Sequence, residues 1–306
     1  MHGSTTLPER IAPMLSQTAA EPFDSADHLF EIKWDGTRCI AFVESSRLRL
    51  QNRRYVEMRH RYPELGGLAK VAPGTVLDGE IIVLDQGRPS FQKLMQRAHL
   101  TDAPRITMLS KRIPATFITF DLLYLGGKPV MGLSLSQRRD KLESVIRELS
   151  DPHVIAADYV IEQGVRYFAG VQNAGLEGIM AKRLDSKYLP GKRTDDWLKI
   201  KVARVDVFEV LGFVPRGKDR IVSALMLGLR EADRWVYKGN VGSGFNEAQR
   251  TEWYRQLSPM PPLLDPPKDG PKDAVWRNTA LRCRVRFFEE TRDGKLRAPV
   301  FEGFEP

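Results

Sequence analysis

Short stretches in which apolar and polar residues alternate run through the first two thirds of the chain, and this period of two predicts β-strands. Residues 75–84 are rich in β-branched side chains, and residues 115–125 are apolar enough for a buried strand. In all, we expect strands at residues 29–43 with a turn at Gly36, 47–51, 75–84, 115–125, 178–183 and 197–202.

Other segments of the same region are predicted to be helical, namely residues 62–70, 91–98, 136–149 and 165–174. Ser90 and Ser136 are the expected N-caps of the second and third helices, because a serine side chain can accept a hydrogen bond from the first turn of a helix.

Beyond residue 203 the pattern changes to short apolar runs between Gly, Pro and charged turns, at residues 206–241. A helix at 243–257, a Pro-rich loop at 259–271 and a strand pair at 281–288 and 296–301 complete this region. Many short strands with one helix favour a small barrel of the OB-fold type. We therefore predict an α+β protein with a domain of antiparallel sheets and helices at residues 1–203 and an OB-fold β-barrel domain at residues 204–306.

The composition argues against several classes of protein, namely disulfide-rich, zinc-binding, membrane-spanning and secreted ones. Among 306 residues there are only two cysteines, Cys39 and Cys283, and five scattered histidines, which argues against a disulfide framework and a zinc site. Any metal would be a hard cation held by carboxylates and phosphates. No apolar run of about 18 residues and no secretory signal is recognised, so we expect no membrane span. The two isolated cysteines suit a reducing, cytoplasmic location.

The formal net charge is +8, and much of the basic charge is concentrated between residues 182 and 204, where eight basic residues face three acidic ones. This segment is either a solvated loop with basic side chains or a wall that faces phosphates.

Three charged side chains, Glu31, Lys33 and Asp35, are spaced by two residues. In a strand they would share one face, with Ile32 and Trp34 on the other. An edge strand with a solvated face is the alternative, but the apolar neighbours and the glycine that follows favour a covered strand beside a ligand. A lysine there acts as a nucleophile only as the neutral amine.

Four further segments carry candidate chemistry. Lys199 and Lys201 share a strand face with Trp197 and could hold a phosphate, although surface lysines on an edge strand are the commoner case. The segments Glu177-Gly178, Phe120-Asp121 and Asp78-Gly79-Glu80 each place carboxylates in strand-forming sequence. Each of these three alone is more often structural, but buried carboxylates need partners, and the lysines or a metal ion could supply them.

Taken together, these segments resemble the covalent nucleotidyltransferase superfamily of DNA ligases, RNA ligases and mRNA capping enzymes. The similarity is carried, in order, by Lys33-Trp34-Asp35-Gly36-Thr37-Arg38, Asn52-Arg53-Arg54, Phe120-Asp121-Leu122-Leu123-Tyr124, Glu177-Gly178-Ile179-Met180-Ala181-Lys182-Arg183, Trp197-Leu198-Lys199-Ile200-Lys201 and Leu296-Arg297-Ala298-Pro299-Val300-Phe301. It spans residues 12–306 and is greatest to the ligase modules of bacterial end-joining enzymes. One departure is Asn52, where the family usually has Ser or Thr.

The resemblance implies that residues 1–203 form an adenylation domain in which Lys33 takes AMP from ATP as a phosphoramidate. It implies catalytic roles for Lys33, Lys199, Lys201 and Arg297, of which Arg297 would orient the pyrophosphate. It implies nucleotide contacts from Glu31, Ile32, Arg38, Arg53, Glu80, Phe120, Met180, Arg193, Lys199 and Lys201. Magnesium or manganese would be held by Asp35, Glu80 and Glu177.

The same resemblance implies that AMP passes from Lys33 to a DNA 5′-phosphate, and that a 3′-hydroxyl then displaces it. Nicked or broken duplex DNA would be the substrate, Ku and a repair polymerase would be partners, and the protein would act as a monomer in DNA repair or end joining. An RNA ligase, a capping-type nucleotidyltransferase and a non-catalytic nucleic-acid-binding protein are the alternatives. Glu31 favours adenine, since an acceptor there suits an exocyclic amine.

Overall fold

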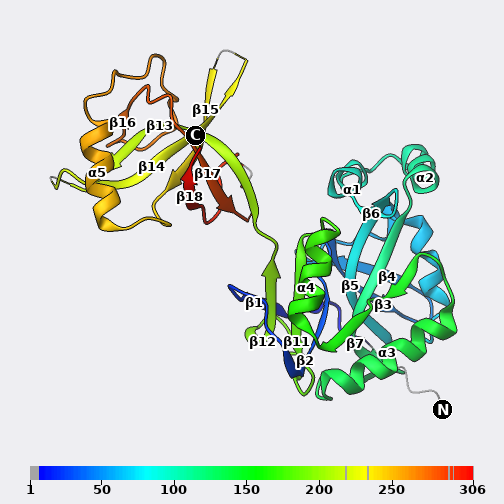
Figure 1. The fold of residues 1–306 in the computed structure, drawn as a ribbon. Coiled ribbons are helices and arrows are strands. Elements are labelled where there is room, and N and C mark those ends of the chain that lie inside the picture. The colour runs from blue at the N-terminus through cyan, green and yellow to red at the C-terminus, as the bar shows by residue number, and fades with distance from the viewer. Residues whose placement is uncertain (1–6, 218, 233, 289, 292, 306) are drawn as a thin grey trace. The chain divides into compact units, whose positions relative to one another are not determined.

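The computed structural model describes residues 7–217, 219–232, 234–288, 290–291 and 293–305. The chain divides into two compact units, of which the first ends at Lys201 and the second begins at Val202 (Figure 1). Within the described ranges, no helix combines the length and the apolar character needed to cross a membrane.

The first unit contains two sheets. One has the strand order β1-β12-β11-β2-β10, in which β1 runs parallel to β12 and the other neighbours are antiparallel. Its strands are β1 (Leu15–Thr18), β12 (Arg193–Lys201), β11 (Gly178–Arg183), β2 (Ser25–Ile32) and β10 (Tyr159–Glu162).

The other sheet has the order β4-β3-β5-β7-β8, and β6 and β9 pair with β5 and β7. Only the β7–β9 pairing is parallel among these strands. Its strands are β3 (Thr37–Val43), β4 (Leu48–Asn52), β5 (Thr75–Asp85), β6 (Arg88–Pro89), β7 (Ala115–Leu125), β8 (Lys128–Pro129) and β9 (Val154–Ala156).

Apolar side chains of both sheets meet in a shared core that includes Phe42, Ile118, Phe120 and Trp197. The outer face of the β3–β5–β7 sheet is covered by helical segments, and the outer face of the other sheet is covered by α4 (Figure 1). The helices of this unit are the 3₁₀ segments Arg59–Arg61 and Pro63–Lys70, α1 (Phe91–Ala98), α2 (Ala103–Arg112), α3 (Leu135–Leu149) and α4 (Gly164–Asn173).

The second unit is an OB-fold built on one antiparallel sheet of order β15-β14-β13-β17-β18, with β16 paired to β13. Helix α5 packs Trp253 and Leu257 into its core, beside Phe208 and Phe301. Its elements are β13 (Arg204–Pro215), β14 (Val222–Glu231), β15 (Arg234–Val241), α5 (Glu247–Leu257), β16 (Val275–Trp276), β17 (Arg282–Phe287) and β18 (Val300–Phe304).

The α+β architecture expected from the sequence is therefore correct, with local differences. Residues 63–70 form a 3₁₀ helix, β12 begins at Arg193 rather than at residue 197, and α2 was not expected. Ser134, not Ser136, caps α3, because the Ser134 hydroxyl and the Gln137 side chain form a reciprocal capping box. The helix expected at 243–257 begins at residue 247, after the N-cap Asn246.

Candidate active site

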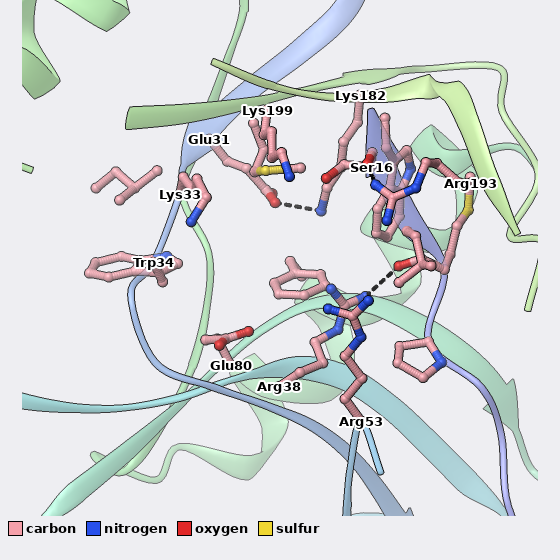
Figure 2. Close-up of a pocket in the computed structure, with 17 residues that line it drawn as sticks. Ser16, Glu31, Lys33, Trp34, Arg38, Arg53, Glu80, Lys182, Arg193 and Lys199 are labelled. Carbon is pink, nitrogen blue, oxygen red and sulfur yellow. Dashed lines mark hydrogen bonds and ion pairs between the residues drawn. The ribbon is translucent and has the colours of Figure 1, made fainter. Parts of the chain in front are cut away.

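A pocket of about 270 Å³ lies in the first unit, and residues of both sheets line it (Figure 2). The register of the strands explains part of the lining, because Met180 on β11 lies opposite both Glu31 on β2 and Lys199 on β12. The lining residues are Pro13, Met14, Leu15, Ser16, Glu31, Ile32, Lys33, Trp34, Arg38, Arg53, Glu80, Phe120, Met180, Lys182, Arg193, Trp197 and Lys199.

Lys33 stands just beyond the end of a strand. Strand β2 ends at Ile32, so the expected alternation of Glu31, Lys33 and Asp35 along one strand face is wrong; Lys33 and Asp35 belong to the turn before β3. The backbone N–H of Lys33 donates to the carbonyl oxygen of Gly178 at 2.9 Å. Gly178 has a φ of +148°, and a Cβ on it would lie 2.1 Å from a backbone oxygen of β12. A glycine is therefore required beside the lysine.

One carboxylate links two of the expected catalytic lysines. The Nζ of Lys33 lies 2.5 Å from Oε2 of Glu177, and the Nζ of Lys201 lies 3.3 Å from Oε1. The three side chains are partly exposed, at 20%, 15% and 25% for Lys33, Lys201 and Glu177. Because these side chains are already partly in water, they can leave one another and contact an incoming ligand at a low cost in desolvation.

Arg38 is fixed against the floor of the pocket by Asp78. Its Nε and Nη2 each donate to Asp78 at 2.6 Å, and the Tyr188 hydroxyl donates to the same carboxylate at 2.7 Å. Burial alone would lower the pKa of Arg38, but the Asp78 carboxylate outweighs this and raises it. The guanidinium therefore stays charged, 4.6 Å from the centroid of the Phe120 ring.

Glu80 lies opposite Arg38 in the register of β3 and β5 and lines the pocket. Burial raises the pKa of Glu80 to about 8, although the positive charges of Arg38 and Lys33 act in the opposite direction. Burial thus favours the neutral form of this carboxyl group, and a nearby cation favours the ionised form.

Glu31 and Lys182 form a buried ion pair at the back of the pocket, marked by a dashed line in Figure 2. Glu31 is 2% exposed and Lys182 1%. The sequence motif indicated Lys182 without assigning it a role, although its spacing of two from Met180 on β11 puts both on the same face.

The N-terminal segment forms a wall that the sequence did not indicate. Residues 13–16 line the pocket, and the guanidinium of Arg193 donates to the carbonyl oxygen of Ser16. Arg53 also lines it, and follows β4 in a turn that the Asn52 side chain stabilises by accepting from the backbone N–H of Arg54 and of Val56.

Other candidate residues lie elsewhere. Asp121 points away from the lined space and pairs with Arg138 in the interior, as a structural residue would. Arg297 belongs to the second unit, where its side chain is exposed. Across the described part of the chain, no group of three or more His, Cys, Asp or Glu side chains is assembled to hold a metal ion.

Comparison with known proteins identifies the family. The family model for the ATP dependent DNA ligase domain matches residues 13–201, and that for the ATP dependent DNA ligase C terminal region matches residues 218–306. The multifunctional non-homologous end joining protein LigD of Pseudomonas aeruginosa is 31% identical over 98% of this chain, but the match spans only 36% of that protein.

DNA ligase C of Mycobacterium tuberculosis is 33% identical, over 83% of this chain and 72% of its own length. Among solved structures, mycobacterial DNA ligase D complexed with ATP and MES is 29% identical, with a TM-score of 0.57 and coverage of 97% of this chain and 96% of that one. The chain belongs to the family of ATP-dependent DNA ligases.

Proposed function

We propose that the protein is an ATP-dependent DNA ligase in which Lys33 carries AMP. The observation that carries this proposal is the position of the Lys33 amine, in a pocket with cationic side chains and hydrogen-bonded to Glu177. The mycobacterial relative that was solved with ATP has the same fold over nearly the whole chain, which supports ATP as the nucleotide.

The pocket offers a partner to each part of ATP. Phe120 and Met180 supply a ring and a thioether for the base, and Glu31, beside Ile32, supplies an acceptor for its exocyclic amine. Arg38 and Glu80 lie together on neighbouring strands, where they can hold the ribose. Arg53, Arg193 and Lys199 add positive charge to the walls for the phosphates.

The reaction begins when the Lys33 nitrogen forms a bond to the α-phosphorus and the bond to pyrophosphate breaks. The amine must give up a proton, and Glu177 Oε2 is within 2.5 Å to receive it. Lys199 and Lys201 would neutralise the α-phosphate as charge develops on it. The bound AMP would then pass to a DNA 5′-phosphate, and attack by a 3′-hydroxyl would release it.

A divalent metal fits this site. Magnesium or manganese is commonly held by one or two carboxylates together with substrate phosphates, and Glu177, Asp35 and Glu80 offer carboxylates near Lys33. When bound, such an ion would neutralise phosphate charge.

Nicked or broken duplex DNA is the proposed substrate, in line with the name of the end-joining relative. The chain spans about a third of that relative, so its activity does not transfer as a whole. We still predict that the protein works with Ku and a repair polymerase. We also predict that it acts as a monomer and lies in the cytosol.

The test is to incubate the purified protein with magnesium and ATP labelled on the α-phosphate, and then to run a denaturing gel. GTP, NAD and the variant Lys33→Ala provide the controls. Labelling from ATP alone, lost in the variant, supports the proposal. Labelled protein is next given a nicked duplex of DNA or of RNA, and transfer of AMP to DNA identifies the substrate. Absence of label after treatment with pyrophosphate to remove bound AMP would contradict the proposal.

A substitution at Arg297 tests whether self-adenylation of Lys33 can be slowed without slowing the sealing of a nick. If Arg297 orients the pyrophosphate, Arg297→Ala lowers self-adenylation far more than the sealing of a nick that already carries AMP. Rates of both steps, measured on one preparation, decide the point. Equal losses would remove Arg297 from the adenylation step.

A further inference from the structure

The ion pair of Glu31 and Lys182 leaves hydrogen-bonding capacity unused at the back of the pocket. The Nζ of Lys182 contacts Oε1 of Glu31, whereas Oε2 has no hydrogen-bond partner within the described ranges. A second cation, Arg139, lies 3.7 Å from that oxygen, but its own hydrogen bonds go to the carbonyl oxygens of Phe120 and Ala157. Glu31 thus lines the pocket with one carboxylate oxygen that makes no hydrogen bond within the described ranges.

Lys182 is confined by aromatic rings. Its Nζ lies 4.0 Å from the centroid of the Phe120 ring and 4.2 Å from that of Trp197, and the side chain is almost wholly buried. Burial lowers the pKa of Lys182, and the carboxylate of Glu31 opposes that effect. The buried ammonium therefore has the Glu31 carboxylate as its ion-pair partner, and the rings leave it little room to move away.

The group at position 6 of a purine decides whether a carboxylate such as that of Glu31 can bind it. Adenine carries an amine at position 6, which donates to a carboxylate, whereas guanine and hypoxanthine carry a carbonyl oxygen there, which a carboxylate repels. A protonated carboxyl group could instead donate to that carbonyl oxygen. The placement of the Glu31 carboxylate in the pocket therefore sets the choice of base.

On the basis of the proposed function, we infer that Lys182 is a positioning residue that holds the Glu31 carboxylate in place for the purine, and so makes the pocket selective for ATP over nucleotides with a 6-carbonyl group. Lys182 acts through Glu31 and need not touch the reacting atoms. Its loss changes which nucleotide is accepted and not only how fast Lys33 reacts.

The experiment measures self-adenylation and the matching inosine reaction with α-labelled ATP and α-labelled ITP, as kcat and KM. Lys182→Met is expected to lower the ATP-to-ITP ratio of kcat/KM by about 10–100-fold, the usual size of a hydrogen bond to a charged group. Lys182→Arg, which keeps the charge, should retain much of the ratio. Lys187→Met, an exposed lysine that follows β11, serves as the matched control and should leave the ratio unchanged.

Glu31→Gln provides a second measurement, which holds even where Lys182→Met fails to fold. It should lower the same ratio, and adding Lys182→Met to it should lower the ratio no further. A folded Lys182→Met variant that loses both nucleotides equally, or a Glu31→Gln variant with an unchanged ratio, would overturn the inference. Wild-type protein labelled by neither nucleotide would instead overturn the proposed function, and the inference with it.

Discussion

Two buried ion pairs of the first unit differ in how completely their hydrogen bonds are satisfied. Arg138 donates to Asp121 at 2.6 and 2.9 Å, and it also donates to the carbonyl oxygens of Leu133 and Ser186. Asp121 accepts one more bond from the backbone of Leu122. Both side chains have no exposed surface. This pair is complete within the protein, and it joins β7 to α3.

The pair of Glu31 and Lys182 is as deeply buried but incomplete, since an oxygen of Glu31 has no hydrogen bond among the described residues. Burial of charge is common to both pairs, so burial alone does not mark a functional site. The unused acceptor of this pair belongs to a side chain that lines the pocket, where a ligand can supply the missing donor. The partly exposed cluster around Lys33 extends the same site.

The largest effect is expected from breaking the complete pair. Asp121→Ala leaves the guanidinium of Arg138 buried without its counter-ion, which should lower the free energy of unfolding by about 3–5 kcal/mol. Urea denaturation of the purified variant measures the loss. The exposed pair of Arg183 and Asp185 provides the control, and Asp185→Ala should leave the midpoint unchanged. A stable Asp121→Ala protein would refute the structural role of the complete pair.

Breaking the cluster at Lys33 should instead slow the reaction and leave the stability of the fold nearly unchanged. Glu177→Ala removes the partner of both Lys33 and Lys201, and the loss of position should slow self-adenylation on the order of a hundredfold. Because Glu177 is 25% exposed, stability should change by less than about 0.5 kcal/mol. Rate and denaturation midpoint are measured on the same preparation. A large loss of stability with an unchanged rate would reverse the assignment.

The sequence predicted much of this site because its residues lie on regular strands. The period of two in residues 178–183 and 197–201 places Met180 and Lys199 on the pocket side, and the motif at Lys33 marks the turn after β2. Glu31, Lys33, Arg38, Phe120, Met180 and Lys199 do line one pocket.

What the sequence could not show depends on contacts between distant segments. The wall at residues 13–16 exists because β1 pairs in parallel with β12, some 180 residues further on, and a four-residue strand carries too little pattern to reveal this. Likewise, the spacing of Lys182 places it on a face but cannot show that its amine contacts Glu31. Ser134 and Ser136 are both plausible caps by residue type, and only the reach of Gln137 distinguishes them.

Gly178→Ala tests whether the backbone around Lys33 is as tightly constrained as the geometry indicates. The new Cβ would lie 2.1 Å from a carbonyl oxygen at a φ of +148°, so a loss of about 1–3 kcal/mol in stability is expected, with slower adenylation. Gly132→Ala is the control, since no atom lies within 4 Å of its added Cβ. Thermal denaturation and adenylation rates compare the two. Equal behaviour of both variants would show that β11 can shift without disturbing the lysine.

The smallest expected effect concerns Glu80, a partly buried carboxyl group that lines the pocket. Burial raises its pKa to about 8, well above the usual value of a glutamate, so between the two values the folded protein holds a proton that the unfolded chain has lost. Stability from this group is therefore present at pH 4 and declines as the pH rises to 8. Glu80→Gln cannot ionise, and should gain about 2–4 °C in melting temperature relative to wild type between pH 5 and pH 8, a modest value because the pocket admits solvent. The mutation Glu9→Gln at an exposed carboxylate gives the baseline, and parallel curves for all three proteins would mean that Glu80 titrates as an ordinary surface acid.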